Sequence, residues 1–461
     1  MIKISKSAYL FVFITVILLI CSACGRNNVD VNDPDQQHNV EVLTILAPDS
    51  WRFDNLLTRA RGQTRSALQR EGRDFYAEIT TYSWEERSDV MLRLRTMLMA
   101  GQGYDIFFLE HMYSMLPFAR SGFLEDINTL IDQCQNTSRE DFFTNVLDAF
   151  TIDNHLYAFP INFGFQYVGI NAKLPEEFIN RFADYETISY TQLIQIYLDL
   201  KYKYESDFGH LSFVNCTFLS HSAGIVYRAV NDFIDFDTNT SYLNNPAFIL
   251  LLTNLRQFEQ NTPLFNNNLA YNGQMFMENH MLQQRAMGFV FSLTSNFWTP
   301  VHALAPTENE YFVHSIPISD DQGRLRIHDK PTRVLHITRA GNTALAWDFV
   351  RHLIGTGLQI TEQEGRFPRV DLMNAPIERE RFSAHFANVI DSLSSFNCAN
   401  QRSLDDIKNR VVVYSEMPIA PPPLVHLHFL EEPIYFLVRG LATPEETAQR
   451  LHNTVSLWLI E

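Results

Sequence analysis

The sequence predicts an α/β fold divided into two lobes. Continuous apolar runs typical of buried strands alternate along the chain with segments of helical periodicity. The chain has 461 residues, and a single hydrophobic core stops growing at about 250–300 residues. A hydrophobic content of 46% and an aromatic content of 13% indicate a large packed core rather than a disordered chain.

The N-terminus has the pattern of a bacterial export signal. Lys3 and Lys6 precede an uncharged apolar run over Tyr9–Ile20, and small residues follow it. The ending Ser22-Ala23-Cys24 resembles a lipobox, with Cys21 where Leu is usual, so we expect Cys24 to be acylated and to become the new N-terminus. Ordinary signal cleavage and a plain membrane anchor are the alternatives, but for an anchor the run is short of a span of about 20 residues.

The chain is acidic, with a formal net charge of −17 at pH 7. Loss of the signal removes two lysines and no acid, which makes the mature chain more acidic still. This balance disfavours nucleic acid or anionic lipid as a partner, because phosphate contacts need clustered Lys and Arg. No later apolar run approaches a membrane span, so we expect attachment through the lipid anchor alone, outside the cytoplasm.

The first elements follow the expected alternation. Leu43–Ala47 predicts a strand, and a helix is expected from about Ser83, where Ser83 and Glu86 have the spacing of a capping box. Gly101 and Gly103 end that helix. The apolar run Tyr104–Leu109 then predicts a parallel strand covered on both faces.

Later segments continue the pattern. A helical segment through Leu116 and Phe118 leads to Gly122–Ile127, and the aromatic stretch Asn154–Asn171 predicts extended, crossing structure. Ala286–Phe291 predicts another buried strand. Two helices are expected near the end of the chain, one over Thr343–Ile354 and a final one capped by Thr443, with Pro444 in its first turn and Glu446 completing the capping box.

Taken in order, these segments resemble the extracellular solute-binding proteins of ABC transporters, in the group that includes maltose-binding protein. Asn154-His155 stands where Gly-Lys is common in that family, and the chain after Gly365 is longer than in its smaller members. The matching segments are the lipobox, Leu43–Ala47, Tyr104–Phe107, Gly122–Ile127, Asp153–Pro160 with Tyr167, Gly169 and Asn171, Ala286-Met287, Pro317 with Gly323, Ala346–Phe349, Gly365–Pro368 and the last helix with Pro444, Glu445, Glu446 and Ala448.

The resemblance implies a periplasmic-binding-protein-like fold of two α/β lobes, joined by hinge strands, with ligand in the cleft between them. It further implies ABC permease subunits as partners, a monomer, no cofactor and no chemistry on the solute. The expected divisions are a signal peptide at 1–23, a flexible tether at 24–40, a first lobe at 41–160 plus 330–372, and a second lobe at 161–329 plus 373–461. Crossings are expected near Phe159–Tyr167, Arg326–Leu335 and Val370–Pro376.

Candidate ligand residues are those that follow predicted strands, because ligands of α/β lobes meet the C-terminal ends of strands. A carbohydrate is the expected ligand, since aromatic faces pack on the C–H face of a sugar while Asp, Glu, Asn and hydroxyl groups pair with its hydroxyls. The predicted set is Asp49, Ser50, Trp51, Glu110, His111, Tyr113, Asn162, Phe163, Phe165, Tyr167, Ser295, Asn296 and Trp298.

Several of these residues also have a purely structural explanation, with no contact to a ligand. Trp51 and Trp298 could cap the core, and Asp49 and Glu110 could be helix N-terminal acids favoured by the helix dipole. Phe163 and Phe165 alternate along an extended segment, so one could face the ligand and the other the core.

Other functions stay open at this point. The family tendency and the aromatic supply favour an oligosaccharide, but peptides, polyols and a role as a sensor partner fit the same fold. A secreted carbohydrate-active enzyme is the alternative from a different class, since a retaining glycosidase needs two carboxyl groups about 5 Å apart.

No metal site is expected. His426-Leu427-His428 would place two rings on one face of a possible strand, but no third ligand stands at a recognised spacing. Cys134, Cys216 and Cys398 form no CxxC pattern, and we expect small buried apolar residues there.

Overall fold

The computed structural model describes residues 40–49, 51–83, 85–109, 116–163, 166–171, 174–204, 212–215, 222–236, 238–261, 286–292, 312–327, 334–355, 375–380, 417–420, 422, 424–425 and 428–460. Glu41–Glu461 form a compact unit of their own, apart from Met1–Val40. The predicted signal peptide and Cys24 lie outside the described residues, as does the tether up to residue 39. No helix among the described residues is long and apolar enough to span a membrane.

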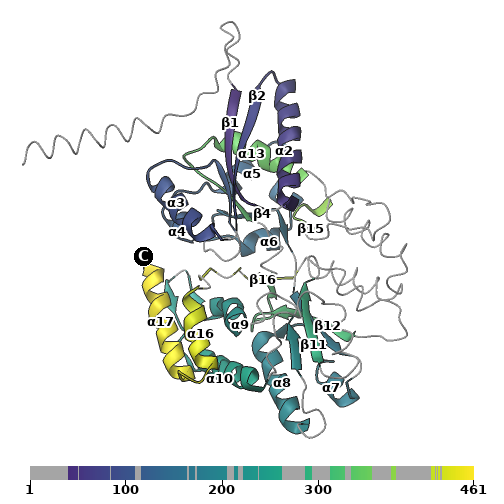
Figure 1. The fold of residues 1–461 in the computed structure, drawn as a ribbon. Helices are drawn as coiled ribbons and strands as arrows, with labels where there is room; N and C mark the ends of the chain where they lie inside the picture. The colour runs from purple at the N-terminus through teal and green to yellow at the C-terminus, as the bar shows by residue number, and fades with distance from the viewer. Residues whose placement is uncertain are drawn as a thin grey trace, which may run out of the picture. The chain divides into compact units, whose positions relative to one another are not determined.

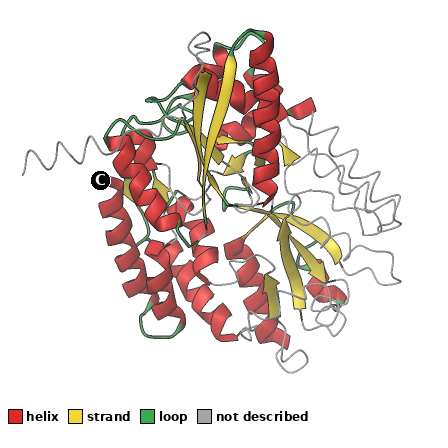
Figure 2. Cartoon of the chain, turned by 45° about the horizontal axis from the view of Figure 1, so that its top comes forward, coloured by secondary structure: helices red, strands yellow, loops and turns green. Residues whose placement is uncertain are grey.

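Helices and strands alternate along the described chain (Figures 1 and 2). The strands are β1 (Val40–Pro48), β2 (Asp74–Tyr82), β3 (Ile106–Leu109), β4 (Phe159–Pro160), β5 (Asn162–Phe163), β6 (Gln166–Asn171), β7 (Ile188–Ser189), β8 (Ser212–Asn215), β9 (Ile234–Asp235), β10 (Thr240–Ser241), β11 (Ala286–Ser292), β12 (Phe312–Ser319), β13 (Leu325–Arg326), β14 (Val334–Ile337), β15 (Ala375–Pro376) and β16 (Ile419–Ala420). The helices are α2 (Trp51–Arg70), α3 (Arg87–Met99), α4 (Leu116–Arg120), α5 (Ile127–Asp132), α6 (Thr144–Ala149), α7 (Glu176–Asn180), α8 (Tyr190–Tyr204), α9 (Ser222–Ala229), α10 (Pro246–Asn261), α13 (Thr343–Gly355), α16 (His428–Val438) and α17 (Pro444–Ile460), with 3₁₀ turns η1 (Arg139–Asp141) and η2 (Val230–Phe233).

The first sheet has five strands in the order β2-β1-β3-β14-β4. β3 runs parallel to β1, with Ile45 beside Ile106, and antiparallel to β14 on its other side. All four residues of β3 are buried. The prediction of a buried parallel strand in this apolar run is therefore confirmed, with the addition of an antiparallel neighbour from far along the chain.

Helices cover both faces of the first sheet. Leu43 and Ile45 of β1 belong to the core that includes Leu57 of α2, whereas Leu46 belongs to the core that includes Leu94 of α3. Successive strand residues point to opposite faces, so two separate cores on one strand mean that each face is covered. Figure 1 likewise shows α2 and α3 on opposite sides of β1.

The second sheet contains seven strands, six of them in the order β16-β13-β12-β6-β11-β8, with β7 paired to β12. β6 lies at its centre between two antiparallel neighbours, β11 and β12. A separate core on the second sheet includes Val168 of β6 and Ile316 of β12, together with residues of α8, α10, α16 and α17. The two-lobed α/β organisation expected from the sequence is thus present, with each lobe defined by one sheet and its helices.

Capping boxes were predicted at the starts of two helices, α3 and α17. The reciprocal hydrogen bonds of the capping box form at Ser83 and Glu86, at 3.0 and 3.4 Å, but the regular helix begins only at Arg87. The box at Thr443 and Glu446 forms at 2.8 and 3.1 Å, directly before α17. The final helix is therefore confirmed at its start, and α3 begins four residues later than expected.

Residues on both sides of the crossing between the sheets contribute to the core that includes Leu43 and Ile45. Ile161 and Phe163 of the crossing segment belong to this core. Ile377 belongs to it too, and its carbonyl accepts a 3.2 Å hydrogen bond from the Phe143 N–H. Residues 375–380 therefore contact the first lobe through Ile377.

Asn154-His155, which replaces the Gly-Lys common in the family, lies in a tight turn. Asp153 and Asn154 both have left-handed backbone, with φ of 50° and 63°. Ile152 and His155 pair as an antiparallel bridge on either side of them. Asp and Asn tolerate left-handed backbone better than other non-glycine residues, so a two-residue hairpin turn forms here without glycine.

The Asp105 carboxylate joins three distant segments of the first lobe. One oxygen accepts hydrogen bonds from the backbone N–H and the hydroxyl of Thr44 at 2.7 and 2.8 Å. The other accepts the N–H of Asn342 at 2.9 Å, directly before α13. Gly341 lies against this site, where an added Cβ would lie 2.3 Å from the Asp105 carboxylate and 3.0 Å from its Cα.

Gly341→Ala is predicted to destabilise the fold by about 1–3 kcal/mol, because the methyl group would displace the Asp105 backbone and its carboxylate. Gly62→Ala is the matched control, since it lies in α2 with no atom within 4 Å of an added Cβ. It should gain about 0.5–1 kcal/mol from helix propensity. Urea unfolding measures both, and equal stabilities for the two variants would contradict the prediction.

His336 of β14 is buried and neutral. Its ring stacks on Phe107, with centroids 4.9 Å apart, and its Nδ1 lies 2.9 Å from the Tyr157 carbonyl. A carbonyl only accepts hydrogen bonds, so Nδ1 carries the proton. Burial lowers the pKa of His336 to about 4, and the Tyr157 hydrogen bond offsets this only in part.

His336 makes the fold less stable in acid. The unfolded side chain takes up a proton below its ordinary pKa of 6.5, whereas the folded one does so only near 4, so stability falls as pH drops through this window. The full effect is about 3 kcal/mol. Urea unfolding from about pH 7 to about pH 4 should show a shallower fall for His336→Phe. An unchanged slope would refute this role for His336.

Candidate functional site

The strand register brings several candidate segments to one edge of the first sheet. Leu109 at the end of β3 pairs with Val334, and Val334 pairs with Pro160 at the end of β4. β1 lies parallel beside β3, so its last residue, Pro48, is next to Leu109 along the same edge. The chain after β1, β3 and β4 therefore leaves the sheet at one common edge, which we call the first strand-end edge.

The second sheet has a corresponding edge. Gln166, where β6 begins, pairs with Ser292, where β11 ends, and Tyr167 pairs with Pro317 of β12. Only residues 161–165 separate β4 of the first sheet from β6 of the second. The crossing segment thus starts at the first strand-end edge and ends at this second one.

A short strand pair stabilises this crossing. β15 pairs antiparallel with β5, with Ala375 opposite Phe163 and Pro376 opposite Asn162. β13, in the second sheet, and β14, in the first, mark another passage of the chain between the sheets. The described chain therefore connects the two sheets at more than one place, close to the strand-end edges.

The structure places part of the predicted ligand set. Asp49 is exposed directly after β1, and its N–H donates a 2.7 Å hydrogen bond to the Tyr82 carbonyl. Trp51 is the first residue of α2, and Asn162 and Tyr167 lie in β5 and β6. The other members, apart from Phe163, lie outside the described residues: Ser50, Glu110, His111, Tyr113, Phe165, Ser295, Asn296 and Trp298.

Phe163 is a core residue, which corrects its place in the predicted set. Its side chain is 1% exposed and belongs to the core of the first lobe. Its ring meets Phe143 edge to face, with centroids 5.2 Å apart. Side chains alternate between two faces along this segment, so one of its two phenylalanines could face the core. Phe163 does.

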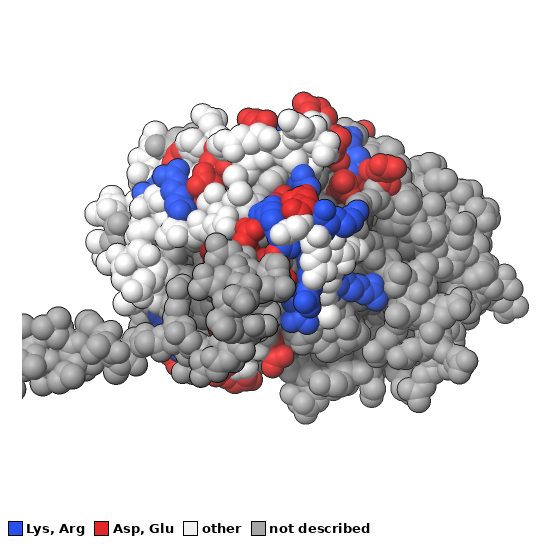
Figure 3. Space-filling view, turned by 90° about the horizontal axis from the view of Figure 1, so that it is seen from above, with Lys and Arg blue, Asp and Glu red and all other residues white. Residues whose placement is uncertain are grey.

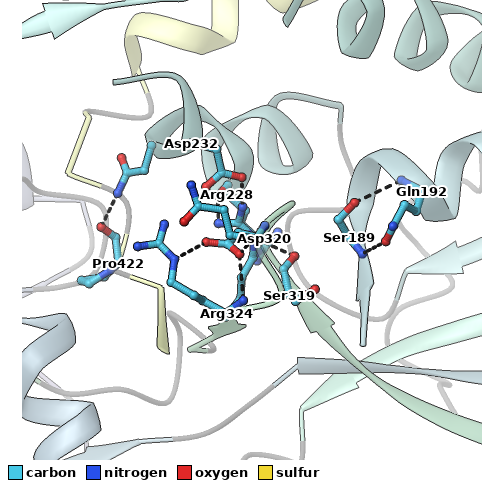
Figure 4. Close-up of polar contacts among 11 residues, drawn as sticks. Ser189, Gln192, Arg228, Asp232, Ser319, Asp320, Arg324 and Pro422 are labelled. Atoms are coloured by element: carbon cyan, nitrogen blue, oxygen red, sulfur yellow. Dashed lines mark hydrogen bonds and ion pairs between the residues drawn. The ribbon is translucent and has the colours of Figure 1, made fainter. Parts of the chain in front are cut away.

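A buried polar cluster at the end of β12 was not predicted from the sequence (Figure 4). The Arg326 guanidinium forms an ion pair with Asp232 and donates to the backbone carbonyls of Arg228 and Ser319, the latter at 3.2 Å. Asp320 accepts a 2.6 Å hydrogen bond from the Arg324 side chain and further bonds from backbone N–H groups. The cluster thus joins η2 of the second lobe to the β12–β13 turn.

Burial has a strong electrostatic effect on this cluster. It raises the pKa of Asp232 to about 6, against the opposing effect of the Arg326 guanidinium. Asp320 and Asp321 add to the rise by like-charge repulsion. Because the Arg326 and Asp320 groups find partners inside the protein, the cluster is suited to holding structure beside the β13 crossing rather than to binding a sugar.

A sequence signal for this cluster does exist. Asp320–Gly323 is a turn pattern in which the Asp320 side chain bonds backbone N–H groups and Gly323 takes a φ of 78°. The pairing of Arg326 with Asp232, 94 positions away, has no local signal. Asn231 extends the contacts of η2, since its side chain donates a 2.6 Å hydrogen bond to the Pro422 carbonyl.

Cys134 is not the small buried apolar residue that was expected. It is half-buried after α5, and its sulfur accepts a 3.0 Å hydrogen bond from Arg351. Burial raises the pKa of the thiol, but hydrogen bonds from Asn136, Thr137 and Arg351 outweigh it and lower the pKa below its usual value. Cys216 and Cys398 lie outside the described residues.

Of the His426–His428 segment, the structure describes only His428. His428 is the first residue of α16, and His426 lies outside the described residues. Within the described part of the chain, no group of three His, Cys, Asp or Glu residues is arranged to hold a metal ion.

No protein-family model matches the sequence, and no curated protein matches it either. Solved structures do match the fold. The sugar-binding protein MalE from Xanthomonas citri matches with a TM-score of 0.59 at 13% identity, over 91% of this chain and 98% of its own. A cyclic α-maltosyl-1,6-maltose binding protein from Arthrobacter globiformis matches with a TM-score of 0.55 at 15% identity, over 91% and 99%.

A third match is the ABC substrate-binding protein Lmo0181 from Listeria monocytogenes, solved in complex with cycloalternan. Its TM-score is 0.53 at 12% identity, over 91% of this chain and 98% of its own. At such low identity these likenesses establish the fold. The chain has the two-lobed α/β fold of ABC solute-binding proteins, as the resemblance in its sequence predicted.

Removing one partner of the buried Asp232–Arg326 pair should cost about 3–5 kcal/mol, because the other charge is left buried without a counter-ion. Asp232→Asn and Arg326→Met test the two sides, and the double variant completes a double-mutant cycle. Its loss should be clearly smaller than the sum of the two single losses. Additive losses in urea unfolding would mean that the two groups do not interact.

Proposed function

We propose that this protein is a lipid-anchored receptor outside the cytoplasm, which binds a carbohydrate and delivers it to an ABC importer. An oligosaccharide is the favoured ligand. The observation that carries the proposal is the fold match over 91% of the chain to proteins named as binders of maltosyl-maltose and cycloalternan. An acarbose receptor and a chitin oligosaccharide binding protein match in the same way.

The arrangement of the two strand-end edges supports a binding function. Asp49 lies at the first edge and the backbone of Tyr167 at the second, with the crossing segment between them. Carboxylate, amide and aromatic groups are the side chains that sugars need. Trp51, Glu110 and Trp298 are proposed to complete the site.

The crossing segments support a hinged receptor. Within the described residues, the crossing segments contain only short strands, such as β4, β5 and β15. In hinged proteins, domain closure is localised at a few connecting residues of this kind, which absorb the backbone rotation. Closure around the sugar would give an importer a shape that differs from that of the empty receptor. The chain needs no cofactor and no catalytic group for this role.

The export pattern supports the location. The proposed acylation of Cys24 would leave the polar segment 24–40 as a tether to the bilayer, and the importer would lie in that same bilayer. Attachment keeps the receptor at a high local concentration beside the permease.

Thermal unfolding of the chain from Gly25 onward, screened against malto- and chito-oligosaccharides, monosaccharides, polyols and peptides, tests the ligand class. A ligand at about 100 times its dissociation constant should stabilise the native state by about 2.7 kcal/mol. Asp49→Asn should reduce the shift, whereas Asp132→Asn, an exposed aspartate at the end of α5, should not.

No shift with any sugar would refute a carbohydrate ligand. A shift with peptides or polyols would reassign it. Formation of shorter sugars during prolonged incubation would favour an enzyme over a receptor, and unchanged binding by Asp49→Asn would remove Asp49 from the site.

A further inference from the structure

One arginine of the first lobe donates hydrogen bonds to the second lobe. Arg120 is the last residue of α4 and is exposed. Its Nη1 donates a 3.1 Å hydrogen bond to the Leu459 carbonyl. Its Nη2 donates to the Phe236 carbonyl at 3.1 Å and to the side-chain oxygen of Asn239. We call these three hydrogen bonds the Arg120 bridge.

The short helix that ends in Arg120 is fixed to the first sheet. Phe118 and Ala119 belong to the same core as Leu46 of β1. The Phe118 ring also lies against that of Phe107 in β3, with centroids 6.0 Å apart. The backbone of Arg120 is therefore held by the first lobe.

The three acceptors belong to one part of the second lobe. Leu459 lies in the last turn of α17 and enters the core of that lobe, against which Phe236 also packs. Phe236 and Asn239 lie in the turn between β9 and β10, which pair as antiparallel strands. His452 of α17 lies 3.2 Å from the Ser241 hydroxyl of β10. The turn and the end of α17 are thus held together.

The end of α17 favours a cation that the helix does not supply. Its last turn contains no basic residue. The carbonyls of a last turn have no partner within the helix, and the helix dipole places partial negative charge on them. A guanidinium offers several N–H donors in a planar fork, and a charged donor forms stronger hydrogen bonds than a neutral one. Arg120 supplies this cation from the other lobe.

Other basic groups of the surface have partners of a different kind. Figure 3 views the end of the molecule that lies uppermost in Figure 1, and it shows basic groups with acidic ones beside them. Arg73 pairs with Glu41 at 2.6 Å and with Glu71 at 3.2 Å, all within the first lobe. Such pairs stay intact when two lobes move relative to each other, whereas a bond between the lobes does not.

The Arg120 bridge is separate from the segments in which the chain passes between the sheets. Those segments lie around β4–β6, β13–β14 and β15, and neither Arg120 nor its three acceptors belong to them. Hinge motion is absorbed in a few connecting residues, while the packed parts on either side move as rigid bodies. The bridge therefore stabilises the lobe arrangement in which it forms against any in which α4 and α17 are farther apart.

We infer that Arg120 is a positioning residue for lobe movement, because its bridge holds the end of α17 and the β9–β10 turn against α4 and must break before they separate. The inference rests on the proposed function only in treating the two lobes as a hinged pair. The apparent affinity of such a receptor depends on the fraction of molecules in the binding-competent arrangement. Arg120 thereby influences how readily the empty receptor binds its solute.

Electron paramagnetic resonance of the sugar-free chain from Gly25 onward tests the bridge, since Glu41–Glu461 form a compact unit of their own. Spin labels carried on p-acetylphenylalanine at Gln63 of α2 and Tyr202 of α8, both exposed, report the distance between the lobes and leave the cysteines unlabelled. Arg120→Gln removes the charge and shortens the side chain, so the distribution of distances should become broader.

A second variant removes one acceptor instead of the donor. Asn239 has a left-handed backbone, with φ of 54°, which glycine adopts without strain. Asn239→Gly should therefore keep the turn and broaden the distribution less than Arg120→Gln, because the two carbonyl acceptors remain.

Arg73→Gln is the matched control, because it removes the same charge from ion pairs that lie within one lobe. It should leave the distance distribution unchanged, and melting temperatures show whether each variant is folded. An unchanged distribution for Arg120→Gln would overturn the inference, and so would equal broadening in Arg73→Gln. The sugar screen is independent: the absence of any sugar-induced shift would refute the proposed function without altering this result.

Discussion

The Asp105 carboxylate is the contact on which the first lobe most depends. It accepts hydrogen bonds from Thr44 at the middle of β1 and from Asn342 before α13, while its own N–H donates to the Thr44 hydroxyl at 3.0 Å. These bonds join segments that are 61 and 237 positions apart, and those to Thr44 hold β1 and β3 in one register. A shift of one residue would reverse every side chain of a strand, so the register also decides which residues reach the strand-end edge.

That register explains why candidate ligand residues from separate parts of the chain lie together. Pro48, Leu109, Val334 and Pro160 are neighbours along one edge, so the segments that follow β1, β3 and β4 leave the sheet at the same place. The crossing segment continues from there to the second sheet. A binding site made in this way uses backbone geometry for its position and side chains for its specificity, which allows ligands to differ within one fold.

The sequence predicted the elements that have strong local signals. The buried run at Ile106–Leu109, the apolar side of α13 and the capping box of α17 were all expected correctly. α2 and β2 were not anticipated, although Leu57, Ala60 and Leu68 have helical spacing, because the arginine-rich remainder of α2 obscures its apolar side. Phe163 was assigned to the ligand because alternation identifies two faces but does not say which is buried. Pairs such as Arg326 with Asp232 depend on tertiary contact, and no local pattern reveals them.

Native mass spectrometry of the mature chain with a mixture of malto- and chito-oligosaccharides tests the central claim most directly, since it detects both a bound sugar and any change in its length. The account predicts a one-to-one complex with one sugar class, selected from the mixture and unchanged in mass after prolonged incubation. Shorter products, or no complex with any sugar, would contradict it.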